Sequence, residues 1–140
     1  MATRSNIGIQ NDDGTIIGIY VHNDGYPDHH VPILTAHYDT EDKVRALLAL
    51  GDLSRLASHV GEAHDLDDYS GKFNDVCNAY GRDRGEKGTD AQTFPSEREF
   101  NLFASNMYTY LFKGGEWLAR SWEDGTWITA KAMLEAEDAA

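Results

Sequence analysis

Residues 6–22 read NIGIQNDDGTIIGIYVH, and this stretch decides the fold. Apolar and polar residues alternate over residues 6–10, which is the period of a β-strand. The run 11–14 supplies turn residues, and Gly14 tolerates the positive φ that a tight loop needs. Residues 15–22 are rich in β-branched and aromatic side chains and predict a second strand. Because both faces of this second strand are fairly apolar, we expect the hairpin to lie inside a larger sheet.

Helical and strand patterns alternate along the rest of the chain. Thr40 is a suitable N-cap, and Ser96 and Glu99 have the spacing of a capping box. The predicted helices cover residues 31–38 with Pro32 in the first turn, 41 to about 50, a short segment after Ser96, and 131–137. The predicted later strands cover residues 73–80, 108–112 and 116–122, with a glycine-rich loop over 81–88 and a hairpin turn at 113–115.

These patterns predict an α+β fold with an antiparallel sheet, built from an N-terminal and a C-terminal hairpin with two to four short helices packed on it. At 140 residues the chain is long enough for one domain with a sizeable core. We expect residues 1–128 to form a single compact domain and residues 129–140 to form a C-terminal helical tail.

The chain is strongly acidic, with 24 acidic and 12 basic residues and a net charge of −12. Such a charge repels phosphate backbones at long range, so we expect no direct nucleic-acid binding. It suits a basic partner surface, including that of a DNA-binding protein whose nucleic acid the chain mimics. Solubility alone is the simpler explanation of the same charge.

The number of cysteines and the hydropathy of the sequence indicate the cellular compartment. Cys77 is the only cysteine, so an intramolecular disulfide and a cysteine-based metal cage are both excluded, and its apolar neighbours predict a buried thiol. The N-terminus lacks the apolar region of a secretory signal, and no apolar run approaches 18 residues. We therefore expect a cytoplasmic protein with no membrane contact.

The histidines are the first candidates for chemistry, because four of the six lie close together at His22, His29, His30 and His37. A helix would place His30 and His37 two turns, roughly 10 Å, apart, which is too far for one metal ion. No histidine pair has the i, i+4 spacing. The sequence also contains no nucleophile elbow. We therefore predict no metal ligands, no catalytic residues and no cofactor.

The most distinctive polar feature is Arg82-Asp83-Arg84-Gly85. Two guanidinium groups beside glycines would clamp a phosphate, and backbone N–H groups would complete the cradle. Tyr80 just upstream would stack on a base. The alternative is a solvated loop in which Asp83 and Glu86 neutralise the arginines.

The C-terminal third is rich in aromatic residues, including Trp117, Trp122 and Trp127. Most of these rings are expected to pack in the core or on a sheet face. Any exposed remainder would form either a subunit interface, as in the homo-oligomer that we expect, or a platform on which a ring stacks.

Several stretches together resemble a family of short bacteriophage accessory proteins. The matching residues are 3–9, Asp13-Gly14, Ile19-Tyr20, His22, Asp24-Gly25-Tyr26-Pro27, His37-Tyr38, Thr40-Glu41, Lys43-Val44, 50–54, 82–86 and 108–112. The resemblance runs from the start to about residue 117 and is most specific in the N-terminal third. Asn23 departs from it, because a tryptophan commonly stands between that His and Asp, and Pro32 is also unusual.

This family is similar to the phage Thoeris anti-defence sponges, which bind cyclic ADP-ribose signals and withhold them from a host effector. The resemblance implies a non-enzymatic, oligomeric α+β protein of the host bacterial cytoplasm that sequesters a small nucleotide signal. Its implied ligand-binding residues are Arg82 and Arg84 for the pyrophosphate and Tyr80 for the adenine, with His22, Asp24 and Tyr26 as a neighbouring wall. The missing tryptophan at Asn23 weakens stacking at that point.

Three other functions fit the residues. An acidic protein–protein inhibitor would occupy the basic channel of a host nucleic-acid-binding defence complex, as an anti-CRISPR or anti-restriction protein does. Alternatively, the chain is a structural module that assembles through its aromatic C-terminal third. A metal-dependent enzyme is the least favoured.

Overall fold

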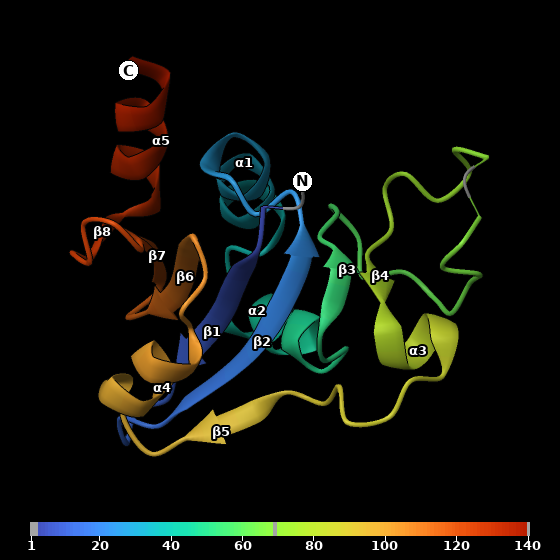
Figure 1. The fold of residues 1–140 in the computed structure, drawn as a ribbon, viewed down its shortest axis with the longest axis horizontal. Coiled ribbons are helices and arrows are strands. Elements are labelled where there is room, and N and C mark those ends of the chain that lie inside the picture. Colours follow the sequence, from blue (N-terminus) through green and yellow to red (C-terminus); the bar gives the residue numbers. More distant parts are fainter. Residues whose placement is uncertain (1–2, 69, 140) are drawn as a thin grey trace.

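The computed structural model of the protein describes residues 3–68 and 70–139, which form one mixed sheet and five helices (Figure 1). The strand order is β4-β3-β2-β1-β6-β7-β8, and β5 pairs with β2 outside this path. The strands are β1 Ser5–Gln10, β2 Ile16–Asn23, β3 Leu53–Arg55, β4 Asn78–Ala79, β5 Gln92–Phe94, β6 Tyr108–Lys113, β7 Glu116–Ser121 and β8 Ile128–Thr129. The helices are α1 Pro27–His37, α2 Glu41–Leu48, α3 Tyr80–Arg84, α4 Glu97–Phe103 and α5 Ala130–Ala139. The predicted α+β fold is confirmed.

Both predicted hairpins are present and antiparallel: β1 pairs with β2, and β6 pairs with β7. The two hairpins are joined through a parallel pairing of β1 with β6, in which Ile7 lies opposite Tyr110. A second parallel pairing joins β2 to β3. The predicted antiparallel hairpins are therefore parts of a mixed sheet, because the pairings of β1 with β6 and of β2 with β3 are parallel. Pairing between segments a hundred residues apart leaves no turn signal from which its direction could be predicted.

The two faces of the sheet are covered unequally. The main core lies between one face and helices α1 and α2, and it includes Ile7, Ile19 and Leu34. A smaller core lies on the opposite face, where Phe100 of α4 packs on Ile16. Figure 1 shows α4 in front of the lower end of β1 and β5 alongside the lower part of β2, with which it pairs, while no described helix stands in front of the upper half of these two strands. That upper half is where the candidate site lies.

Several element boundaries differ from the predicted ones. Helix α1 begins at Pro27, four residues before the predicted start, because this proline fits the first turn of a helix. Pro32 therefore lies inside the helix, with its ring exposed. The predicted strand at 73–80 shrinks to the two residues of β4, and the predicted loop at 81–88 begins as helix α3.

Of the two N-caps predicted from the sequence, one forms as predicted and the other does not. The Thr40 hydroxyl accepts a hydrogen bond from the Lys43 N–H and so caps α2, as predicted. Ser96 is the N-cap residue of α4, but its hydroxyl bonds to the Glu99 carboxylate instead of to a backbone N–H. The reciprocal capping box is therefore not formed.

The C-terminal third contains both buried and exposed aromatic residues. Trp117 is buried and donates to the Tyr38 carbonyl at 2.8 Å, and Trp127 is half-buried beneath the Arg120 guanidinium. Trp122 is 61% exposed. Helix α5 packs beside α1 and buries Met133. The predicted homo-oligomer stays a prediction. None of the helices described between residues 3 and 139 is long and apolar enough to cross a membrane.

Candidate functional site

The clustered histidines do not converge on one point. His29 bonds to the Leu56 carbonyl, His30 is buried in the core, and the exposed His37 lies beside His59. His22 lies on the opposite face of the sheet from α1, next to Tyr20. Among residues 3–68 and 70–139, no group of three or more His, Cys, Asp or Glu side chains could hold a metal ion.

A serine and a histidine that the sequence analysis did not pair are hydrogen-bonded in the core. The Ser5 Oγ lies 3.0 Å from the His30 Nε2, and both residues are 0% exposed. His30 also packs against the Tyr110 ring, whose hydroxyl donates to the Gly25 carbonyl. Full burial gives a substrate no access to Ser5, so the pair holds β1 against α1. The thiol of Cys77 is equally buried, and burial raises its pKa.

Burial lowers the pKa of His30 to about 3, from 6.5. The unfolded chain therefore binds a proton that the folded chain excludes, and stability should be lost as the pH falls from about 6.5 toward about 3. We expect His30 to contribute a loss of up to about 1.4 kcal/mol per pH unit in this window. Urea unfolding across the window checks it. His30→Leu should reduce the slope, whereas exposed His37→Gln should retain it, and equal slopes in all three proteins would contradict the assignment.

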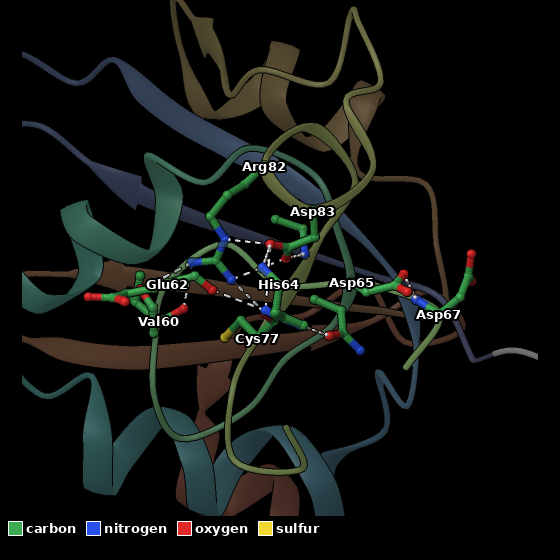
Figure 2. A network of polar contacts seen from close by, with 11 residues as sticks. Val60, Glu62, His64, Asp65, Asp67, Cys77, Arg82 and Asp83 are labelled. Atoms are coloured by element: carbon green, nitrogen blue, oxygen red, sulfur yellow. Dashed lines mark hydrogen bonds and ion pairs between the residues drawn. The ribbon is translucent and has the colours of Figure 1, made fainter. Parts of the chain in front are cut away.

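Arg82, the first predicted phosphate ligand, is held in a polar network within the protein (Figure 2). Its Nη1 donates to the Val60 and Gly61 carbonyls at 2.7 and 3.3 Å. Its Nη2 donates to the Cys77 carbonyl at 2.8 Å, and its Nε donates to Asp83 at 2.9 Å. The guanidinium thus connects residues 60–61 to Cys77, just before β4, and to α3. We call Arg82, Asp83 and His64 the arginine clasp.

The other two members of the clasp are also fully engaged. The Asp83 carboxylate accepts the backbone N–H groups of His64 and Ala79 at 3.1 and 2.8 Å. Burial acts to raise the Asp83 pKa, but the hydrogen bonds from Arg82 and these N–H groups outweigh it and lower the pKa. The His64 Nε2 lies 2.6 Å from the Asn78 Oδ1, and its ring stacks on Phe73. Arg82 therefore has a structural role that leaves no guanidinium edge for a phosphate.

Three of the remaining predicted residues lie near one another: Tyr80, Arg84 and His22. They surround Tyr20 and Arg4, two residues that were not predicted from the sequence. The Tyr20 hydroxyl lies 2.7 Å from the His22 Nδ1. The Arg84 guanidinium lies over the Tyr80 ring, 5.5 Å from its centroid. We call the five residues Arg4, Tyr20, His22, Tyr80 and Arg84 the tyrosine surface. A signal for it was present, because Tyr20 and His22 alternate with the core residues Ile19 and Val21.

Strand register places the two tyrosines in one row across the sheet. Val21 lies opposite Leu53, and Leu53 lies opposite Ala79, so residues 20, 52 and 80 share a level. The Asp52 carboxylate accepts the Tyr20 N–H at 2.9 Å, and the Asp52 carbonyl accepts the Tyr80 N–H at 3.2 Å. Burial raises the pKa of the Asp52 carboxyl. Asp52 therefore fixes both tyrosines relative to each other.

The charges on this surface are mostly exposed. Burial raises the pKa of the Tyr20 hydroxyl, Tyr80 and Asp52 add to the shift, and the nearby Arg4 charge opposes it. Arg84 has a side chain that is 44% exposed, with Asp67 and Glu86 at 3.4 and 3.6 Å. Ion pairs at such exposure are weak, so an incoming anion can compete for the guanidinium. The arrangement offers two cationic side chains, two phenol rings and an imidazole.

The other two predicted residues lie past the end of β2. Asp24 has a left-handed φ of 59°, which aspartate tolerates better than most residues, and its carboxylate lies 3.8 Å from the Arg55 Nε. Tyr26 is 41% exposed, and its ring edge meets His29. Each therefore has its main contact outside the tyrosine surface.

No family model, no curated protein and no solved structure matches the chain.

Proposed function

We propose that this protein is a non-enzymatic phage counter-defence protein that sequesters a cyclic nucleotide signal of the cyclic ADP-ribose type in the host bacterial cytoplasm. The ligand binds on the tyrosine surface. One observation carries the proposal: Arg4 and Arg84 flank two tyrosine rings and a histidine on a part of the sheet face that no described helix covers. Compared with the site predicted from sequence, Arg4 takes the place of Arg82.

The chemistry of each side chain suits one part of such a ligand. Arginine guanidinium groups bind phosphate oxygens bidentately, so Arg4 and Arg84 are assigned to the pyrophosphate. The Tyr80 ring offers a face for adenine, because base–aromatic stacking contributes about 1–3 kcal/mol per base. The Tyr20 hydroxyl and the His22 ring add polar contacts for a ribose.

The burial of two candidate nucleophiles supports a role in binding without catalysis. Ser5 and Cys77 are both 0% exposed, and the histidine beside Ser5 is buried with it. On the tyrosine surface itself, the candidate groups are suited to holding a phosphate and a base. The proposal therefore assigns the protein a binding role and no catalytic residue.

Calorimetric titration with cyclic ADP-ribose isomers tests the proposal. We expect saturable binding of at least one isomer, and Arg4→Ala combined with Arg84→Ala should weaken it about a hundredfold or more, since hydrogen bonds to charged groups contribute about 1.5–3 kcal/mol each. The matched control is Arg98→Ala combined with Lys113→Ala, which removes the same charge from exposed positions elsewhere and should retain affinity. No heat with any isomer in a folded sample would refute the proposal.

The acidic inhibitor is a second candidate, and one observation favours it. Exposed carboxylates follow one another along a single segment, at Glu62, Asp65, Asp67 and Asp75. Such an acidic segment would bind a basic channel through contacts that weaken with salt. Two results together would establish this candidate in place of the first. One is a complex with a host nucleic-acid-binding protein that dissociates at high salt. The other is the absence of heat when nucleotides are titrated into the protein.

A further inference from the structure

A polar cleft of about 650 Å³ lies between the ends of β2, β3 and β4 and the segment 66–75. It shares no residue with the tyrosine surface. Its lining residues are Asn23, Asp24, Ser54, Arg55, Leu66, Asp68, Phe73, Asn74, Asp75 and Asn78. Three carboxylates, three carboxamides and one hydroxyl thus surround a small apolar floor. This composition suits a ligand that is rich in hydrogen-bond donors.

The outer wall of the cleft is fixed by contacts to the rest of the domain. The Arg55 Nη1 donates to the Asn74 carbonyl at 2.9 Å, and the Phe73 ring stacks on His64 at 4.5 Å between centroids. A β-bridge joins His59 to Val76, and the arginine clasp holds residues 60–61. The cleft is therefore formed before any ligand arrives, which lowers the entropic cost of binding.

The lining already binds cations that belong to the chain itself. The Arg55 guanidinium lies between the Asp24 carboxylate and the Asn74 carbonyl, and the Lys72 ammonium lies over the Phe73 ring, 5.4 Å from its centroid. The Asp75 carboxylate, by contrast, makes no ion pair or hydrogen bond with the residues that the structure describes. Three aspartates line the cleft against one arginine, and the charge there stays negative when the adjacent Lys72 is counted as well.

We infer that this cleft binds a small organic cation that carries an ammonium or guanidinium group. Asp75 and Asp68 receive the cationic group, and the carboxamide of Asn74 accepts a remaining N–H donor, with Asn78 beside it in the lining. The Phe73 ring edge and Leu66 cover its carbon chain. The inference does not depend on the nucleotide proposal, because an anionic ligand and a cationic ligand require opposite electrostatic surroundings and use different residues.

Titration of the full-length protein with agmatine, followed by ¹H–¹⁵N NMR, tests the inference. We expect saturable shifts of the side-chain amide signals of Asn74 and Asn78. Asp75→Asn should weaken binding about tenfold or more, since it removes one charged hydrogen-bond acceptor. Glu135→Gln, which removes the same charge from an exposed position on α5, should leave the affinity unchanged. Asp75 is exposed, so its replacement should leave the fold intact, and circular dichroism verifies this.

Three results would overturn the inference. One is an equal, non-saturating shift when potassium chloride replaces agmatine at the same ionic strength, which would show general screening. Another is saturable binding that Asp75→Asn and Glu135→Gln weaken equally. The third is saturation by an arginine-rich peptide without any response to agmatine, which would assign the cleft to a protein partner instead of a small molecule.

Discussion

Arg82→Ala is expected to lower the free energy of unfolding by about 3–5 kcal/mol, the usual cost of removing one partner of a buried ion pair. The Asp83 side chain is 0% exposed, and Arg82 donates to both of its carboxylate oxygens. Without the guanidinium, a carboxylate would remain buried and the Val60, Gly61 and Cys77 carbonyls would lose their donor. Urea unfolding at neutral pH measures the loss.

Arg84 provides the matched control for this experiment, because it lies two residues away on the same short helix. Its ion pairs are exposed, so Arg84→Ala should change the unfolding free energy by less than about 1 kcal/mol. Arg82→Lys should recover only part of the loss, since an ammonium group cannot reproduce the planar fork of donors. Equal stability of Arg82→Ala and Arg84→Ala would show that the clasp is not structural.

Phe100→Ala is expected to lower the free energy of unfolding by a similar amount, about 3–5 kcal/mol, because it leaves a cavity in the smaller core. Phe100 is 0% exposed and packs against Ile16, Phe94 and Leu111. Its ring lies on two glycines of the first hairpin, where a Cβ at Gly18 would lie 2.5 Å from the ring and one at Gly8 would lie 2.9 Å from it. Thermal unfolding monitored by circular dichroism checks the loss.

The close approach of the ring to Gly18 supplies a second arm for this test. Gly18→Ala alone should cost about 1–3 kcal/mol through overpacking. In the Phe100→Ala background the added methyl group enters the vacated space, so its cost should largely disappear. If the two losses simply add, α4 does not pack on the hairpin in the way described.

The parts of the fold that were predictable are those with local signals. The first hairpin follows from the alternation of Ile7 and Ile9 and from the Gly14 turn, and the second follows from the Gly114-Gly115 turn. The same alternation places Tyr20 and His22 on the face opposite the main core, and these are two of the five residues of the tyrosine surface. The start of α2 was predictable for an equally local reason, because the Thr40 side chain accepts a hydrogen bond from a backbone N–H in the first turn of the helix.

The remaining features depend on contacts between distant segments. The parallel pairing of β1 with β6 has no local signal. The role of Arg82 was hidden because its partners at residues 60, 61 and 77 are close only after folding. Arg4 likewise has no local signal, because only the folded sheet brings it beside Tyr20.

Recovery of the bound ligand tests the central proposal most directly. The protein is incubated with cyclic ADP-ribose isomers, separated from unbound ligand, and heated, and the released molecule is identified by mass spectrometry. The proposal predicts that one isomer is released with its mass unchanged, and that the Arg4→Ala and Arg84→Ala double variant releases none. Failure of every isomer to be retained, or release of a hydrolysed product heavier by one water molecule, would contradict sequestration without catalysis.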